Sequence, residues 1–147
     1  MAIDRIMNTQ VVTVELDDTL ATVKDIFDNA HFHHLLVVED GHLEGIISDR
    51  DLLLAISPNI GTKAETPKDR QALKRPVHQI MTRDPLTLKP TASIFEAIYL
   101  FNRNRISCLP IIDDNRVAIG VVTWRDILKA IEADLSKRVV ANRNKTP

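Results

Sequence analysis

The chain has 147 residues, of which 44% are hydrophobic and 27% charged, and its formal net charge is −1. This composition is typical of a globular protein, and the near balance of acidic and basic residues excludes an overall field that attracts nucleic acid or anionic lipid. The single cysteine, Cys108, excludes an intrachain disulfide framework and fits a cytoplasmic location. The longest apolar run, residues 52–56, is far shorter than the ~20 residues of a membrane helix, and the first residues have no apolar stretch of signal-peptide length.

The chain contains two related halves. Matched residues stand 74 positions apart, and one inserted residue near position 118 raises the interval to 75. Because this register holds over most of each half, it indicates a gene duplication in which each copy is a small supersecondary module. The matched pairs include Ile6-Met7 with Ile80-Met81, Val37-Val38 with Ile111-Ile112, Gly45 with Gly120, and Asp51 with Asp126.

The first half predicts the order β-α-β-β-α. An apolar segment over 11–16 leads through a capping residue, Asp17, into a helix whose apolar residues stand three or four apart. Two runs rich in β-branched residues, 35–38 and 45–47, surround a turn-prone sequence and predict a hairpin. A second helix over 49–56 closes the half.

The second half predicts the same order. An apolar segment over 86–88 and a capping residue, Thr91, precede a helical pattern. A second hairpin is predicted from the runs 109–112 and 117–122, which surround an acidic, turn-prone sequence. The last predicted helix covers 124–135.

The segments outside the two halves are polar. A stretch with prolines and a glycine, 57–74, predicts a linker over the surface, and a short helix is expected over 77–81. The basic segment 136–147 predicts a solvated, fraying tail. The chain therefore divides into a first repeat at 1–56, the linker, a second repeat at 75–135 and the tail. Because a repeat of about sixty residues is marginal alone, we expect an α/β (α+β) fold in which two β-α-β-β-α repeats pack about a pseudo-two-fold axis, with a concave groove between them.

Each half ends its last predicted strand with a hydroxyl residue and, three positions later, an aspartate: Ser48 to Asp51 and Thr123 to Asp126. This spacing resembles a capping box, in which the two side chains satisfy free N–H groups at a helix start. It also suits a nucleotide, because a helix N-terminus attracts phosphate and an acidic side chain can accept hydrogen bonds from ribose hydroxyls. The arginines inside the two motifs add charge of the sign that suits phosphate: Arg50 and Arg125.

The duplicated pattern resembles a tandem pair of cystathionine-β-synthase (CBS) domains, or Bateman module. The resemblance rests on individually weak motifs that occur in the same order twice. It covers 1–56 and 75–135, and within the family the chain is most similar to small stand-alone CBS-pair proteins, including the acetoin-utilisation type. The motifs are the Ile-Met opening, the strands His34-Leu35-Leu36-Val37-Val38 and Cys108-Leu109-Pro110-Ile111-Ile112, and the Gly-x-x-Ser/Thr-x-x-Asp endings.

The resemblance implies a regulatory module that binds adenosine-containing ligands, such as AMP, ADP, ATP or S-adenosylmethionine, in clefts between the repeats. It also implies a homodimer in which two chains form a flat disc, with an unidentified client protein as a further partner. Carried over position by position, the resemblance implies that Asp51 and Asp126 bind the ribose hydroxyls. It also implies that Ser48 and Thr123 lie near the ribose or the phosphate. The remaining assignments are adenine contacts at Val12 and Phe32 in one cleft and at Leu86 and Ile106 in the other, and cleft-facing positions at His33, His34, Ser107 and Cys108.

The two clefts differ in chemistry. The first repeat offers two histidines where the second offers Ser107 and Cys108, so we expect unequal affinities. Each cleft is expected to combine the Ser/Thr-x-x-Asp motif of one repeat with the early strand of the other. Trp124 has two interpretations, stacking on a base or burial at a packing or dimer surface.

Other functions have less support in the sequence. A protein-interaction or dimerisation scaffold without ligand binding is the main alternative. An enzyme is disfavoured because no set of acid, base and nucleophile emerges from the spacing. A metal site at His31, His33 and His34 is disfavoured because no further ligand is fixed nearby, so these are expected to be cleft or surface histidines. Sparse aromatic residues and the low net charge argue against nucleic-acid binding.

Overall fold

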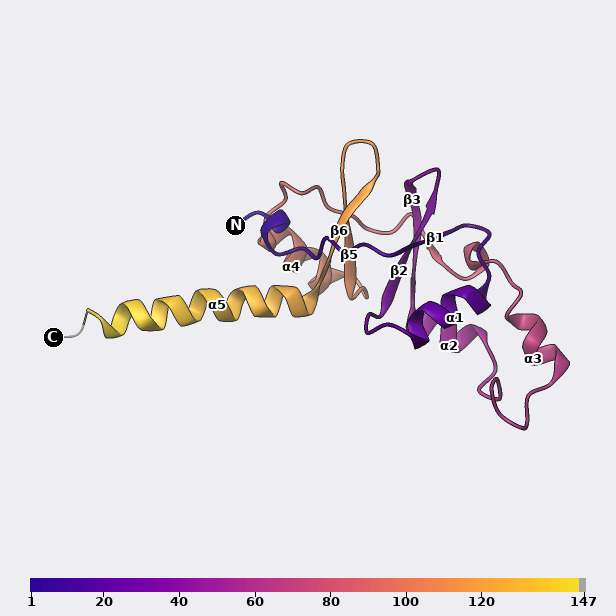
Figure 1. Ribbon diagram of the computed structural model, residues 1–147. Coiled ribbons are helices and arrows are strands. Elements are labelled where there is room, and N and C mark those ends of the chain that lie inside the picture. Colours follow the sequence, from indigo (N-terminus) through magenta and orange to yellow (C-terminus); the bar gives the residue numbers. More distant parts are fainter. Residues whose placement is uncertain (146–147) are drawn as a thin grey trace.

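The computed structural model describes residues 1–145 and contains two repeats of the predicted β-α-β-β-α order (Figure 1). The elements of the first repeat are β1 (Thr13–Glu15), α1 (Leu20–Asp28), β2 (His34–Glu39), β3 (His42–Ser48) and α2 (Asp49–Ala55). Those of the second are α4 (Ile94–Arg103), β5 (Cys108–Ile112), β6 (Ala118–Thr123) and α5 (Trp124–Arg143). Shorter elements lie before and between them: η1 (Ile3–Arg5), α3 (Pro67–Ala72), η2 (Val77–Gln79) and β4 (Thr82–Arg83).

The two sheets share one arrangement. In the first, β1 runs parallel to β2, and β3 lies antiparallel between β2 and β4. In the second, β5 and β6 form the antiparallel hairpin, with single bridges on either side: Leu88 parallel to Ile111 and Asn8 antiparallel to Val121. Both predicted hairpins are therefore confirmed, whereas the segment expected at 86–88 contributes one bridge and no strand of its own.

Each repeat is completed by the opening segment of the other. Ile3, Ile6 and Met7 pack into the core of the second repeat, and η1 donates a backbone hydrogen bond from Ile3 to Ala92 at 2.7 Å. Figure 1 shows this N-terminal segment beside α4. Reciprocally, Val77, Ile80 and Met81 pack into the core of the first repeat. Neither repeat thus has a complete apolar core of its own.

The recurring glycines make this exchange possible. A Cβ at Gly45 would lie 2.5 Å from the Met81 sulfur and 2.8 Å from the Thr82 carbonyl oxygen. A Cβ at Gly120 would lie 2.5 Å from the Met7 sulfur. The repeated Gly and Ile-Met signals are therefore two sides of one contact, in which each methionine packs on a bare backbone.

The two repeats also meet through their hairpins. Leu36, Leu43 and Ile112 form a small buried cluster between the sheets. At the hairpin tips, Leu43 donates its N–H to the Arg116 carbonyl at 2.9 Å, and the Arg116 guanidinium donates to the Leu43 carbonyl at 3.0 Å. The expectation that the halves pack sheet against sheet is confirmed.

The predicted caps of the first helix in each repeat were wrong. Thr19 caps α1, accepting from the Thr22 N–H at 3.3 Å, and Ser93 caps α4 in a reciprocal capping box with Glu96. Asp17 and Thr91 each lie two residues earlier. The Ser-x-x-Glu spacing was the signal that identifies the cap of α4.

The segments outside the repeats carry more helix than expected. The linker contains α3, which begins with a capping box between Thr66 and Asp69 and has Pro67 at its first position. The predicted tail is exposed to solvent as expected, but it is helical and not frayed through Arg143, because α5 continues that far and projects away from the rest of the molecule (Figure 1). Residues 146–147 of the predicted tail lie outside the described residues. Within residues 1–145, no helix has both the length and the apolar character needed to cross a membrane.

Candidate functional site

The two Ser/Thr-x-x-Asp motifs form capping boxes at the starts of α2 and α5. Asp51 accepts the Ser48 N–H on Oδ2 at 2.9 Å, and Ser48 Oγ accepts the Asp51 N–H at 3.0 Å. In α5, Asp126 Oδ2 accepts the Thr123 N–H at 2.8 Å and its hydroxyl at 3.1 Å. The capping interpretation is confirmed in both repeats.

Capping leaves one oxygen of each aspartate available. All the hydrogen bonds that Asp51 and Asp126 accept go to Oδ2, and within residues 1–145 no group donates to either Oδ1. Both side chains are half-buried, so the second oxygen is held by a fixed rotamer at a helix N-terminus. Each carboxylate can therefore cap its helix and accept a hydroxyl from a ligand at the same time.

The sheet register gathers further predicted residues around these motifs. His34 lies opposite Ser48, and Cys108 lies opposite Thr123. Beside His34, the Val12 carbonyl accepts the Leu36 N–H at 3.2 Å, so Val12 lies at the same end of the first sheet. Leu86 takes the equivalent place in the second sheet, two residues before the bridge at Leu88.

A hydrogen bond between repeats joins these two sheet ends. His34 Nε2 lies 2.9 Å from Ser107 Oγ. Burial lowers the pKa of His34, and the nearby Asp49 carboxylate opposes this shift only in part. The ring is therefore neutral at pH 7. Sequence reasoning placed both residues near the clefts and missed this bond, since no spacing within one repeat encodes a contact between repeats.

His33 and Asp49 form a pair at the edge of the site. The His33 ring Nδ1 lies 2.8 Å from Asp49 Oδ2, and the Asp49 N–H donates to the His33 carbonyl at 3.0 Å. Both side chains are partly open to solvent. Asp49 was missed by the sequence analysis, although its position directly after the cap Ser48 was a signal for the first turn of α2.

Cys108 is more enclosed than the sequence analysis expected. Its side chain is only 6% exposed, so it offers almost no surface to a cleft. Burial, and then the negative charge of Asp126, raise the pKa of the thiol to about 12. At neutral pH the group is a protonated, weakly polar side chain.

The four predicted adenine contacts fall into two groups. Val12 and Leu86 are exposed and have free apolar surface. Phe32 and Ile106 are half-buried and pack against the cores of their own repeats, and Phe32 meets Phe27 edge to face at a centroid distance of 6.3 Å. Val12 and Leu86 therefore offer exposed apolar surface to a base, whereas Phe32 and Ile106 are held in the cores.

The arginines of the two motifs are exposed. Within residues 1–145, Arg50 has no carboxylate within ion-pair distance. The Arg125 guanidinium lies 5.8 Å from the ring of Trp124, which is itself half exposed. Both positive charges are therefore accessible to an anionic ligand. No group of three or more His, Cys, Asp or Glu side chains in the described part of the chain is placed to hold a metal ion.

The repeat pattern has a counterpart among known proteins. Residues 3–58 and 77–133 each match the family model of the CBS domain. The chain belongs to the CBS domain family. A CBS domain-containing protein of Dictyostelium discoideum is 34% identical over 128 residues, covering 86% of this chain and 88% of its own. An inosine-5′-monophosphate dehydrogenase of Methanocaldococcus jannaschii is 33% identical over 127 residues, and this chain spans only 23% of that larger enzyme.

Solved structures share the fold of the CBS pair. The CBS domain pair of protein MJ0100, in complex with 5′-methylthioadenosine and S-adenosyl-L-methionine, has a TM-score of 0.75 at 23% identity, covering 91% of this chain and 98% of its own. An acetoin utilization protein, AcuB, from Vibrio cholerae has a TM-score of 0.73 at 23% identity, covering 100% and 98%. CBSX2 in complex with AMP has a TM-score of 0.74 at 20% identity, covering 90% and 97%.

Proposed function

We propose that this protein is a regulatory module that binds an adenosine-containing ligand where its two repeats meet. The observation that carries the proposal is the second carboxylate oxygen of Asp51 and of Asp126, held ready at a helix start by the capping box. Two structural relatives support the ligand class, since one was solved with S-adenosyl-L-methionine and 5′-methylthioadenosine and the other with AMP. AMP, ADP, ATP and S-adenosylmethionine are the candidate ligands.

In this proposal each part of the ligand has its own partner. Oδ1 of Asp51 or Asp126 accepts the ribose hydroxyls, because an ionised acceptor makes stronger hydrogen bonds than a neutral one. The adenine rests on the exposed apolar surface of Val12 or Leu86. The phosphates, or the carboxylate of the methionine chain of S-adenosylmethionine, extend over the helix start, where Arg50 or Arg125 and the helix dipole suit negative charge. The chain senses its ligand and does not catalyse.

The proposal includes an inequality between the two sites. The first repeat contributes a histidine paired with Asp49 and a second histidine bonded to Ser107, while the second contributes a buried thiol. Because these groups differ in donors and in charge, the two sites take the same ligand with different affinities.

Regulation requires that the ligand prefers one of two arrangements of the repeats. A ligand that contacts both repeats changes the free energy of their relative placement, and the His34–Ser107 bond lies on that boundary. In this proposal the module is a cytoplasmic homodimer. The ligand-induced change in the placement of its repeats is transmitted to a client protein.

Isothermal titration calorimetry with AMP, ADP, ATP and S-adenosylmethionine tests the proposal. At least one ligand is expected to bind the unmodified protein. Asp51→Asn and Asp126→Asn keep an oxygen for the cap and lose the ionised carboxylate, so each is expected to weaken binding by about tenfold or more at its own site. No binding heat with any ligand up to millimolar concentration would refute the proposal.

The chain supplies a matched control in α3. Asp69 occupies the same position of another Ser/Thr-x-x-Asp capping box, in the linker and outside both repeats. Asp69→Asn makes the same chemical change, so it is expected to leave ligand affinity unaltered. An equal loss in all three variants would show that the effect comes from helix capping and not from ligand contact.

The alternative, an interaction scaffold without a ligand, is favoured by one observation. Helix α2 exposes Leu53 and Leu54, and α4 exposes Phe95. Exposed apolar side chains of this size favour contact with another protein surface. If the Asp51→Asn/Asp126→Asn variant loses ligand binding but still self-associates, the result supports the sensor. If the unmodified protein self-associates and binds none of the ligands, the result supports the scaffold.

A further inference from the structure

Helix α5 extends well past the part of the chain that matches the CBS family. The match ends at residue 133, and α5 continues to Arg143. Ile127 is its one buried residue, and every described position from Ile131 onward is exposed. A helix of about a dozen residues with exposed side chains is marginal in water, because packing supplies most helical stability. The extension therefore needs a partner surface.

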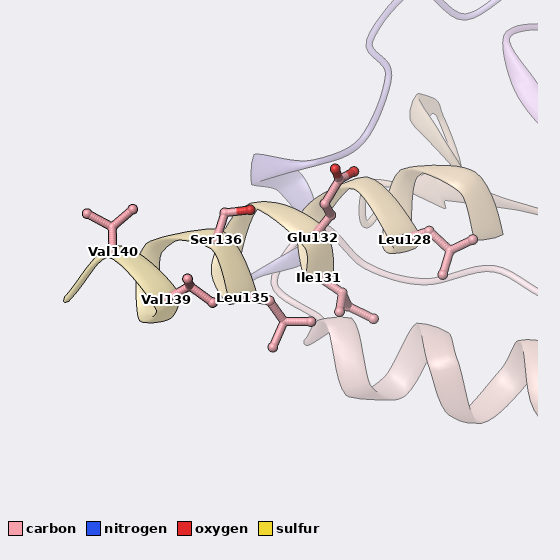
Figure 2. A pocket seen from close by; sticks show the side chains of 7 residues that line it. All are labelled: Leu128, Ile131, Glu132, Leu135, Ser136, Val139 and Val140. Carbon is pink, nitrogen blue, oxygen red and sulfur yellow. The ribbon is translucent and has the colours of Figure 1, made fainter. Parts of the chain in front are cut away.

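Helix α5 carries a narrow apolar stripe, which begins in the matched part and continues into the extension. Leu128, Ile131, Leu135 and Val139 are spaced three, four and four residues apart, and their side chains are between 38% and 54% exposed. At 3.6 residues per turn these positions fall on one face of the helix. Figure 2 shows Leu128, Ile131 and Leu135 projecting to one side of α5, with Glu132 pointing away from them.

This stripe has the form of a helix-pairing seam. Leu128, Ile131 and Leu135 have the three-and-four spacing of a and d positions in coiled coils. Val139 stands four residues further on, so the whole stripe has the 3-4-4 spacing of an 11-residue repeat, which also keeps apolar residues on one helix face. Charged residues flank it, among them Glu132 and Arg138, and Arg138 forms an ion pair with Asp134 at 3.1 Å. A surface helix that enters a bilayer presents a wider apolar face, so the pattern favours a second helix as the occupant.

The distribution of charge along α5 indicates that the second helix is the α5 of another copy of this chain. Residues 124–134 contain three acidic and two basic side chains, whereas residues 135–145 contain four basic side chains and no acidic one. A parallel pair of these helices would place the basic halves of both chains side by side. An antiparallel pair places each basic half against the half of the other chain that contains the three acidic side chains, and a two-fold axis generates both contacts at once.

We propose that the α5 stripes of two copies of this chain pair antiparallel and form a contact of its dimer. Helix α4, which packs beside α5, exposes Phe95 and Tyr99, so the approaching copy finds further apolar surface next to the seam. The contact does not depend on the ligand proposed above, and a protein that fails to bind nucleotide still tests it.

Analytical ultracentrifugation of the full chain tests the pairing. Leu135→Asp/Val139→Asp places two charges in the seam and is expected to raise the dimer dissociation constant by about tenfold or more. The matched control, Ala133→Asp/Ala141→Asp, adds the same charges to the opposite face of α5 and is expected to leave the constant unchanged. Circular dichroism checks that both variants keep a cooperative thermal transition.

Disulfide cross-linking tests the orientation. Chains carrying Leu128→Cys and chains carrying Val139→Cys are expected to cross-link with each other when mixed, and neither is expected to cross-link with itself. The native Cys108 is buried and does not interfere. Self-linking of each variant, a monomeric unmodified protein, equal dissociation constants in all variants, or binding of monomers to anionic lipid vesicles in place of self-association would each overturn the proposal.

Discussion

The starts of β2 and β5 occupy equivalent places in the two repeats, and burial shifts the pKa of their titratable side chains in opposite directions. At β2, His34 is half-buried and burial lowers the pKa of its ring. At β5, Cys108 is buried and burial raises the pKa of its thiol to about 12. Desolvation always disfavours the charged form, which is the acid form of histidine and the base form of cysteine. Both positions are therefore uncharged at neutral pH.

This comparison predicts where the proposed ligand would find charged partners. At the strand starts the boundary carries His34, Ser107 and Cys108, while carboxylates stand beside it on the helix starts, at Asp49 and Asp51 in α2 and at Asp126 in α5. The repeats keep this layout although their side chains at the boundary differ. Duplication preserved the backbone frame and the caps, and divergence acted on the first residues of the strands.

The reactivity of Cys108 offers the largest contrast. Raising the pKa of the thiol from 9.0 to about 12 lowers the fraction of thiolate about a thousandfold at pH 8. We expect native protein to react with a disulfide reagent slower than denatured protein by at least this factor. Stopped-flow absorbance measures both rates, and fast labelling of the native chain would contradict the burial of the β5 start.

The two methionine contacts are expected to differ in strength. Gly45→Ala brings a Cβ against the backbone carbonyl of Thr82 as well as the Met81 side chain, while the Cβ of Gly120→Ala meets only the Met7 side chain. A flexible side chain can move and a paired backbone cannot, so we expect losses of about 3 kcal/mol for Gly45→Ala and about 1 kcal/mol for Gly120→Ala. Urea unfolding checks this, and equal losses would count against it.

The bond between the repeats is expected to contribute modestly. A double-mutant cycle of His34→Ala and Ser107→Ala should give a coupling free energy of about 1 kcal/mol, the usual contribution of one hydrogen bond. Chemical unfolding of the four proteins measures it. Additive effects would mean that the two side chains do not hold the repeats together.

The pH dependence of stability isolates the same histidine. Because the folded pKa of His34 lies below its unfolded value, the unfolded chain takes up a proton first as the pH falls below about 6.5. The contribution of neutral His34 to the free energy of unfolding should therefore be complete above that pH and decline below it. His34→Gln should show a shallower decline in urea titrations between pH 7 and pH 5, and an unchanged slope would remove the buried histidine as its cause.

Most of the fold could be predicted from local patterns in the sequence. The helical spacing around Leu20 and Ile94 predicted helices, and the apolar runs on either side of residues 39–41 predicted a hairpin. The 74-residue repeat then predicted the same elements in the second half. The caps at Asp17 and Thr91 failed because several polar residues precede each helix and only geometry selects among them.

What the sequence could not provide were contacts between the repeats. The packing of Met7 on Gly120 and the bond from His34 to Ser107 depend on how two modules dock, which no spacing within one module encodes. The length of α5 was also missed, because the residues after Leu135 lack the buried face by which a helix is usually recognised. The motif residues Ser48 and Asp51 were found since capping chemistry is local.

Backbone amide NMR during titration with AMP or S-adenosylmethionine is the most direct measurement of whether ligand joins the two repeats. Resonances at the start of α2, around Ser48 and Asp51, and at the start of α5, around Thr123 and Asp126, are expected to shift, together with Ser107 at the boundary. Shifts confined to one repeat, to the distal half of α5 or to the linker helix would contradict a site shared by both halves.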